Sequence, residues 1–135
     1  MIKKTDVIHT SGKRKTAVAR ATLKQGTGKV FINKCLLQNV KPKLYALRIK
    51  EPLILSGELA DKIDLNVNVF GGGFSSRADA ARIAISNALV EFKPALKQIF
   101  LDYDRAMLIS DVRARESSKP NSQGSARSKR QKSYR

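Results

Sequence analysis

Two segments of the chain have a clear repeat of apolar residues. Residues 62–70 alternate between apolar and polar residues, which predicts a β-strand with one buried face. From Arg77 to about Phe92, apolar residues recur at intervals of three and four, which predicts an amphipathic helix. Ser76 followed by Asp79 resembles a capping box and favours a helix start there. The predicted core positions of this strand and this helix are Ile63, Leu65, Val67, Val69, Ala81, Ala84, Ile85, Ala88, Leu89 and Phe92.

The first third of the chain contains a weaker alternating pattern. Residues 15–23 place small residues on one face and partly basic residues on the other, as expected for a strand. Residues 29–33 predict a second strand through Val30, Phe31 and Ile32. The glycines within residues 25–28 suit a tight turn. The pattern therefore predicts that the two strands form an antiparallel hairpin.

Residues 41–57 favour a short helix. Pro42 suits its first turn, and Leu44, Leu47 and Arg48 follow at helical spacing. Pro52 is expected to end or kink this helix, so that residues 53–55 form either a further helical turn or an apolar connector.

Pro94 is expected to open a last helix. This helix runs to about Tyr103, with Leu96, Ile99 and Phe100 facing inward and Tyr103 as a further inward candidate. The order strand, strand, short helix, strand, helix, helix predicts an α/β (α+β) body of two layers, with helices over one sheet.

The last 24 residues have a different composition. Residues 112–135 contain eight Lys or Arg, one Glu and no large apolar residue beyond Val112. Such a segment has too little apolar surface to offset the entropy of folding, so it is expected to be an extended tail that becomes ordered along a polyanion. Fully extended, it would reach about 80 Å. We therefore expect a globular RNA-binding domain at residues 1–111 and a basic tail at residues 112–135.

The charge of the chain favours a nucleic-acid partner. The formal net charge is +16, and the tail carries +7 of it. RNA is the commonest dense array of negative charge that such a chain meets. No apolar run approaches the ~20 residues of a membrane span, and no signal peptide, basic amphipathic membrane helix or lipidation signal is visible, so no membrane partner is expected.

Candidate chemistry for catalysis or metal binding is sparse. His9 is the only histidine and Cys35 the only cysteine, and neither belongs to a cluster at ligand spacing. No nucleophile, base and orienting group can be assembled, so we expect no catalytic site, no metal and no cofactor. A cytoplasmic protein that is not an enzyme is the expectation.

Gly71, Gly72 and Gly73 stand between the predicted strand and the longest helix. They serve either a tight strand-to-helix turn or a backbone cradle for an RNA phosphate. The lysine and hydroxyl residue of a P-loop do not follow, so a nucleotide site is disfavoured. Residues 26–30 also lack the P-loop pattern and are expected to form the hairpin turn.

Three consecutive cations precede the first predicted strand. Lys13, Arg14 and Lys15 repel one another unless a polyanion neutralises them, although solvation alone is the alternative. Arg20, Arg77 and Arg82 are candidates to extend this patch. The alternative for Arg77 and Arg82 is ordinary pairing with Asp79.

Several segments together resemble one known family. They are SGKRKTAVARATL at residues 11–23, EPLILSGE at 51–58, GGGF and ADAARIAISNALV between 71 and 90, YDRAMLISDVR at 103–113, and KRQKSYR at 129–135. In this order they resemble the family of the ninth protein of the small ribosomal subunit, in its archaeal and eukaryotic form. The resemblance covers nearly all of residues 8–135.

The resemblance implies a fold and a place of action. The implied body is a two-layer sandwich with a roughly four-stranded mixed sheet, helices on one face and a left-handed βαβ crossover. The implied partners are ribosomal RNA in the head of the small subunit, neighbouring head proteins and peptidyl-site tRNA, which the tip of the tail would contact. An extraribosomal RNA-binding protein or chaperone is the alternative that charge alone leaves open.

The site residues follow from the charge pattern and the resemblance together. The expected contacts to ribosomal RNA are Lys13, Arg14, Lys15, Arg20, Gly71, Gly72, Gly73, Arg77, Arg82, Arg113, Arg115, Lys119 and Arg127. The expected contacts to tRNA are Lys129, Arg130, Lys132, Tyr134 and Arg135.

Two positions depart from the pattern of the family. Ser76 and Arg77 stand where relatives usually have Gly-Gln, which restricts the approach of a backbone but adds a cation. Asn87 stands where Arg is frequent, so no RNA contact is expected at that position.

Overall fold

Five strands form one mixed sheet in the structure, a computed structural model that describes residues 7–120, 126 and 127. The strands are β1 (Ile8–Arg14), β2 (Ala17–Gln25), β3 (Val30–Ile32), β4 (Cys35–Leu36) and β5 (Ile63–Phe70). Their order across the sheet is β1-β2-β5-β3-β4, and only the β3–β5 pair is parallel.

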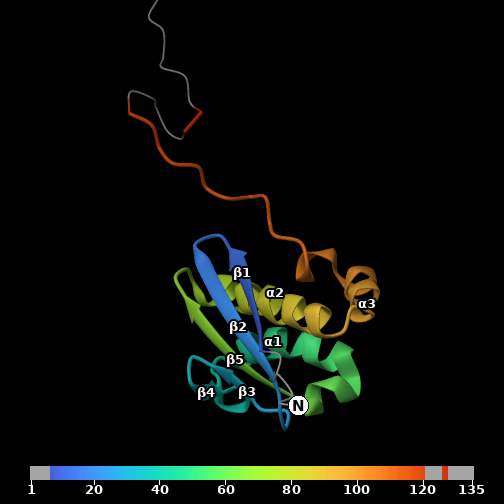
Figure 1. The fold of residues 1–135 in the computed structure, drawn as a ribbon. Helices are drawn as coiled ribbons and strands as arrows, with labels where there is room; N and C mark the ends of the chain where they lie inside the picture. The colour runs from blue at the N-terminus through green and yellow to red at the C-terminus, as the bar shows by residue number, and fades with distance from the viewer. Residues whose placement is uncertain (1–6, 121–125, 128–135) are drawn as a thin grey trace, which may run out of the picture.

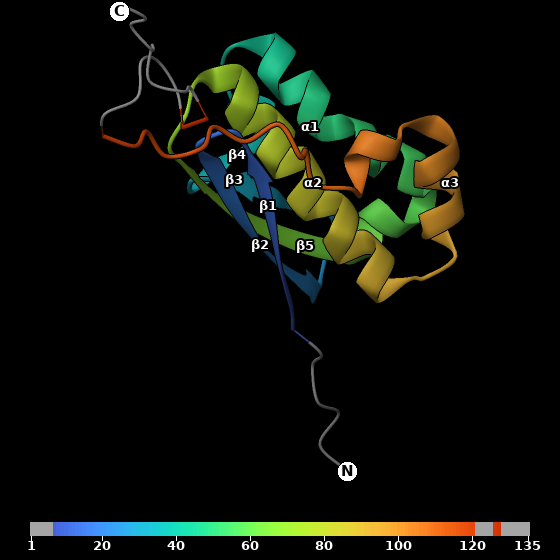
Figure 2. The same cartoon turned by 90° about the horizontal axis from the view of Figure 1, so that it is seen from above.

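Three α-helices and three short 3₁₀ helices complete the described body. They are η1 (Leu37–Asn39), α1 (Lys43–Ser56), η2 (Gly57–Lys62), α2 (Phe74–Phe92), α3 (Leu96–Tyr103) and η3 (Arg105–Met107). The three α-helices lie on one side of the sheet (Figures 1 and 2), so the other face is open. The expected two-layer α+β architecture is confirmed, with five strands rather than about four. The β3–α1–β5 segment joins two parallel neighbours, and the expected left hand of this crossover stays a prediction.

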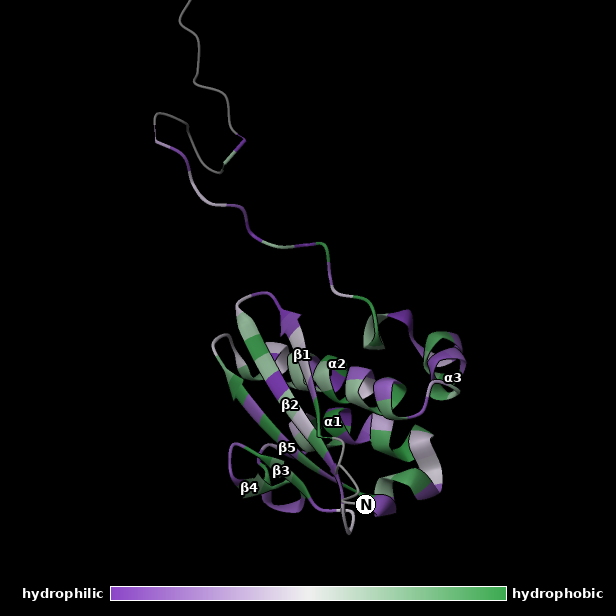
Figure 3. Cartoon of the chain, viewed as in Figure 1, coloured by the Kyte–Doolittle hydropathy of each residue, from purple (hydrophilic) through white to green (hydrophobic). Residues whose placement is uncertain are grey.

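The core lies between the sheet and α2. Ala17, Ala19, Ala21 and Leu23 on β2 are buried, as are the four predicted apolar residues of β5. Figure 3 shows hydrophobic parts of β2 interrupted by hydrophilic ones, and the alternating burial along β2 fits a strand with one covered face. The small side chains of β2 allow α2, which buries several alanines of its own, to pack closely on the sheet.

The predicted hairpin between residues 15–23 and 29–33 is wrong. β5 inserts between β2 and β3 and pairs with both strands. The loop at residues 26–29 therefore packs on the start of β5 and does not close a hairpin. The carboxylate of Asp64 accepts hydrogen bonds from the backbone N–H of Thr27 and Lys29, each at 2.9 Å. A Cβ at Gly26 would lie 2.1 Å from the Asp64 carboxyl group, so a side chain there would displace this carboxylate from its hydrogen bonds.

Replacing Asp64 with Asn should change the acid dependence of stability. The hydrogen bonds from Lys29 and Thr27 lower the pKa of Asp64 in the folded protein. This contribution to stability is present above the unfolded pKa of about 4 and is lost as the pH falls through the lower folded pKa. We expect Asp64→Asn to be less stable than the wild type at pH 7, with the difference closing as the pH approaches 2. Urea unfolding at a series of pH values measures this, and a difference that is constant with pH would contradict it.

In α1 and α3, some apolar residues that the sequence places at helical spacing are exposed instead of buried. α1 continues through Pro52 to Ser56, but Leu44 and Leu47 are 70% and 58% exposed. Its buried face consists of Tyr45, Ala46, Ile49 and Pro52. In α3, Leu96 and Phe100 are buried as predicted, whereas Ile99 and Tyr103 are exposed.

The predicted capping box at the start of the longest helix is wrong. α2 begins at Phe74 with Gly73 as its N-cap, and no side chain caps it. Ser76 therefore lies within the first turn. Asp79 instead forms ion pairs with Arg48 and Arg14.

Candidate nucleic-acid interface

The turn between β1 and β2 separates the three consecutive cations. Lys13 and Lys15 are exposed, and neither forms an ion pair among the residues that the structure describes. Lys15 has a φ of 54°, which allows the chain to reverse within two residues. Arg14 instead forms ion pairs with Asp111 and, at 3.7 Å, with Asp79. Lys13 and Lys15 are thus available to a phosphate, while Arg14 holds the body together.

The glycine turn lies directly against this hairpin turn. Gly71 and Gly72 have φ values of 73° and 62°, which favour glycine. A Cβ at Gly71 would lie 2.5 Å from the Thr16 carbonyl oxygen, and one at Gly72 would lie 2.9 Å from the Ala17 Cβ. These two glycines therefore allow close packing, which is the structural alternative that the sequence left open. Gly73 has no atom within 4 Å of its added Cβ.

The first turn of α2 adds donors and a cation beside the glycines. No side chain caps α2, so its first backbone N–H groups lack a side-chain acceptor at the positive end of the helix dipole, and residues 73–75 around them are exposed. The Nε of Arg77 donates to the Gly71 carbonyl at 2.8 Å, which holds this exposed arginine over the turn. The fold thus gathers residues distant in sequence at one end of the body. We call this surface the cationic end; it consists of Lys13, Lys15, Gly73 and Arg77.

Arg77 also borders a small hollow. The hollow measures about 300 Å³, and Tyr45 and the exposed Phe74 line it together with Arg77. Burial raises the pKa of Tyr45, and the nearby Arg77 guanidinium partly opposes this effect. Tyr45 therefore stays a neutral hydroxyl near neutral pH.

Arg20 lies on the open face of the sheet. It is exposed, stands in register between Ser11 on β1 and Asn68 on β5, and its guanidinium lies 5.5 Å from the centre of the Phe70 ring. The sequence predicted Arg20 as an RNA ligand but missed Phe70. The strand predicted at residues 62–70 already includes Phe70, and its alternation places Phe70 on the same face as Asn66 and Asn68.

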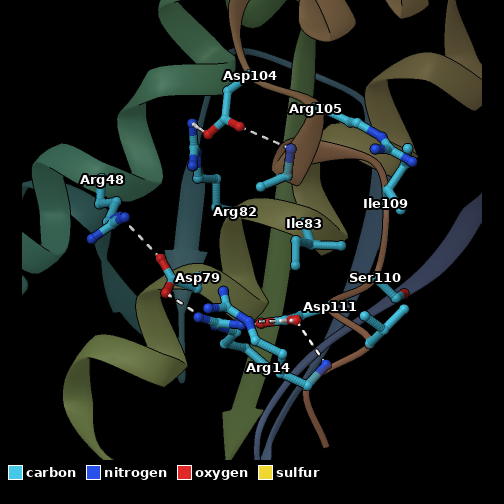
Figure 4. A pocket seen from close by; sticks show the side chains of 13 residues that line it. Arg14, Arg48, Asp79, Arg82, Ile83, Asp104, Arg105, Ile109, Ser110 and Asp111 are labelled. Atoms are coloured by element: carbon cyan, nitrogen blue, oxygen red, sulfur yellow. Dashed lines mark hydrogen bonds and ion pairs between the residues drawn. The ribbon is translucent and has the colours of Figure 1, made fainter.

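Arg82 occupies a different environment from the other candidates. It is only 6% exposed; its Nε lies 2.7 Å from Glu51 Oε2, and its Nη2 lies 2.8 Å from Asp104 Oδ2. Figure 4 shows Arg82 directed toward Asp104. Arg82 thereby connects α1, α2 and the start of η3. Because its charge is already compensated and buried, we leave it out of the interface. Asp79, the partner that the sequence suggested, pairs with Arg48 at 2.9 Å instead.

Arg14 and Asp111 fix the start of the tail. Figure 4 shows Arg14 between Asp79 and Asp111, at the edge of a hollow of about 480 Å³. The Asp111 carboxylate also accepts hydrogen bonds from the backbone N–H of Arg113 at 2.9 Å and from its Nε at 3.2 Å. The tail therefore begins next to the cationic end. The sequence did not reveal this anchoring role of Asp111, because its partner lies almost a hundred residues away.

The described part of the tail is exposed. Residues 111–119 contain no helix or strand, Val112 is 93% exposed, and Figure 1 shows the segment running away from the body. The side chain of Arg113 is 80% exposed, and Arg115 and Lys119 are exposed as well. Arg127 pairs with Glu116, through its Nε at 2.9 Å and also through its Nη2. The predicted tRNA contacts Lys129, Arg130, Lys132, Tyr134 and Arg135 lie outside the described residues.

In the part of the chain that the structure describes, the groups that would indicate other activities are not brought together. His9 Nδ1 lies 3.1 Å from the Thr22 hydroxyl, and Cys35 is an exposed free thiol. Within residues 7–120, 126 and 127, no group of His, Cys, Asp and Glu side chains is arranged to hold a metal ion. Over the same residues, no helix has the length and apolarity needed to cross a membrane.

Clustered surface cations and a basic extension on a small folded body are features that structural nucleic-acid-binding proteins share. Residues 12–135 match the family described as Ribosomal protein S9/S16. Two relatives are named small ribosomal subunit protein uS9. That of Methanococcus maripaludis (strain C7) is 51% identical over 132 residues, which cover 96% of this chain and 98% of the relative. That of Methanococcus vannielii is 50% identical with the same coverage.

The chain therefore belongs to the ribosomal protein S9/S16 family. This confirms the family that the sequence segments indicated, and the archaeal relatives agree with the predicted branch. The family comprises ribosomal structural proteins, so the expectation that the chain is not an enzyme is also confirmed.

Proposed function

We propose that this protein is a structural constituent of the small ribosomal subunit whose body binds ribosomal RNA in the head. Relatives that match almost the full chain are named as proteins of that subunit, which supports this assignment. The observation that carries the RNA-binding part is the cationic end. Lys13 and Lys15 reach it from the β1–β2 turn and Arg77 reaches it from α2, with no carboxylate paired to either lysine in the described residues. As a ribosomal protein, it acts in the cytoplasm.

The geometry supports phosphate binding at the cationic end. Exposed cations and outward backbone N–H groups of a helix start both attract phosphate. Gly73 leaves the approach to that helix start open, while Gly71 and Gly72 shape the turn. Arg20 adds a further exposed cation on the adjoining sheet face. Contacts of this kind fix the position of a protein on folded RNA without reading its sequence.

The tail extends the proposed interface away from the body. Anchored by Asp111, it presents Arg113, Arg115, Lys119 and Arg127 as candidates for ribosomal RNA. A narrow polycation enters crevices between RNA helices that a folded domain is too wide to enter. The division at residue 111 stays a prediction, supported by the change from half-buried Asp111 to exposed Val112. Neighbouring head proteins are the remaining proposed partners.

We further propose that the tip of the tail contacts peptidyl-site tRNA. Residues 129–135 contain four cations and Tyr134. Arginine offers bidentate contacts to phosphate, and a tyrosine ring stacks on a base or ribose. Positive charge between two RNA backbones lowers their mutual repulsion. The tip would therefore stabilise a bound tRNA without any catalytic step.

Deleting residues 129–135 should weaken tRNA binding while sparing subunit assembly. The deletion removes four cations from the end of the tail and keeps the proposed contacts of the body, so we expect normal incorporation into subunits and faster dissociation of peptidyl-site tRNA, by about tenfold. Dissociation of labelled tRNA from purified subunits measures this. A full-length variant with Gln at Lys129, Arg130, Lys132 and Arg135 separates charge from length and should behave like the deletion. An unchanged dissociation rate in both variants would refute the proposed tRNA contact.

A further inference from the structure

The sheet has a face that the rest of the described body does not cover. All three helices lie on the opposite side (Figure 2), so side chains that point away from them meet solvent. Strand register places these side chains in rows across β1, β2 and β5. The rows are Lys13–Val18–Phe70, Ser11–Arg20–Asn68 and His9–Thr22–Asn66. We call these nine residues the outer sheet face.

The outer sheet face is cationic and contains no carboxylate. Lys13 and Arg20 supply positive charge, and Lys24 continues it along β2. The next acidic side chain along β5 is Asp64, whose carboxylate accepts hydrogen bonds from the backbone N–H groups of Thr27 and Lys29. The remaining polar groups on the face are hydroxyls, amides and one imidazole, which donate and accept hydrogen bonds. Such a surface suits an anionic partner with polar edges.

Phe70 gives this face an aromatic surface. The Phe70 side chain is 48% exposed although it follows four buried apolar residues of β5, so the core does not account for it. The Arg20 guanidinium, 5.5 Å from the ring centre, adds a second planar group beside it. Nucleic-acid bases stack on both aromatic rings and guanidinium planes.

The aromatic surface at Phe70 lies close to the cationic end. Lys13 belongs both to the outer sheet face and to the cationic end, so the two surfaces are continuous. The amides of Asn68 and Asn66 stand next to Phe70 along β5, two and four residues back on the same face. An RNA strand whose phosphates lie at the cationic end can therefore place a base on Phe70 and its polar edge near these amides.

We propose that the outer sheet face binds an unpaired segment of RNA, with one base stacked on Phe70 beside Arg20. Double-helical RNA does not fit this role, because the faces of its bases are stacked inside the helix and only base edges, sugars and phosphates reach the protein. The inference rests on the proposed RNA-binding function and specifies which form of RNA this surface takes. Phe70 and Asn68 then join Arg20 and Lys13 as RNA ligands.

Binding of the full-length protein to three RNA probes tests whether an RNA base stacks on Phe70. The probes are a labelled single-stranded oligonucleotide, a hairpin duplex of equal phosphate number, and the single strand made abasic at its central positions. Phe70→Leu removes the ring and keeps an apolar side chain, whereas Phe70→Tyr keeps the ring. Tyr103→Leu is the matched control, because Tyr103 is also exposed, at 58%, but lies on α3 in the helix layer on the opposite side of the sheet.

The expected result is selective. Phe70→Leu should weaken binding of the single strand by about 5- to 100-fold and leave duplex binding within about twofold. Phe70→Tyr and Tyr103→Leu should bind like the wild type, and the abasic strand should not distinguish Phe70→Leu from the wild type. Circular dichroism checks that each variant is folded.

The outcomes separate this inference from the function on which it rests. If the wild type binds neither RNA, the proposed function itself fails. If the wild type binds both the single strand and the duplex, but Phe70→Leu weakens neither complex or weakens both equally, the proposed stacking on Phe70 is overturned. The proposed RNA-binding function then still stands.

Discussion

Replacing Gly12 with Ala should unfold or strongly destabilise the body. Gly12 lies in β1 where the strand crosses close to α2, and Thr10 donates a hydrogen bond to the Ala84 carbonyl at 2.7 Å nearby. An added Cβ would lie 2.3 Å from the Ala80 carbonyl oxygen and 2.6 Å from the Ala84 nitrogen. Both atoms belong to the backbone of α2, so the strand and the helix would have to separate. We expect a loss of about 3 kcal/mol or more, from a total stability of about 5–15 kcal/mol.

Thermal and urea unfolding of the isolated protein measure this effect. For a body of this size, we expect Tm to fall by about 10 °C or more. Gly73→Ala is the matched control, because Gly73 has a φ of −85° and nothing lies within 4 Å of its added Cβ. That substitution should change stability by less than about 1 kcal/mol. Wild-type stability in Gly12→Ala would show that β1 and α2 are not in this close contact.

The same close contact explains why the sequence does not reveal β1. Its covered face consists of Ile8, Thr10 and Gly12, with Arg14 at the end. Because α2 allows no side chain at Gly12, this face lacks the row of apolar residues that marks a strand. β5 and α2 carry complete apolar rows, and their periodicity predicted both elements to within a few residues. Local pattern is thus informative only where packing allows large side chains.

The order of strands depends on pairings that local sequence does not encode. The glycines at positions 26 and 28 look like a hairpin turn, but the backbone N–H of Gly28 donates to the Ile63 carbonyl of β5 at 3.1 Å. Likewise, α1 has apolar residues on more than one face, and the packing against α2 decides that Ile49 is buried while Leu47 is exposed. Long-range contacts settle both questions.

The candidate site shows the same limit. Sequence finds cations but does not show which of them the fold already neutralises. Arg82 and Lys13 look equivalent in the sequence, yet Arg82 is enclosed by carboxylates from α1 and from the start of η3. Lys13 stays exposed because it points away from the helix layer, on which the acidic partners of Arg14 and Arg82 lie. The side of the sheet therefore decides which cations are available to RNA.

Removing residues 112–135 should have the largest effect on RNA binding. The truncation deletes eight cations and one carboxylate, a net charge of +7, and keeps Asp111 in place for Arg14. Each phosphate that a cation neutralises contributes about 0.7 to the slope of log affinity against log salt for single-stranded RNA. If the truncated protein neutralises about seven fewer phosphates, the slope should become shallower by about 5. Between 50 and 200 mM salt, the wild type should then lose about 10³-fold more affinity than the truncated protein.

Affinity for a fragment of small-subunit RNA, measured across that salt range, tests this expectation. A full-length variant with Gln at all eight tail cations should have the slope of the truncation, whereas a tail of scrambled order should have that of the wild type. An unchanged slope after truncation would mean that the body alone releases the counterions and that the tail does not lie along RNA. The comparison of the scrambled tail with the neutral tail separates charge from residue order. A segment that is anchored at Asp111 and has no core of its own needs only its charge, and no fixed side-chain geometry, to bind along RNA.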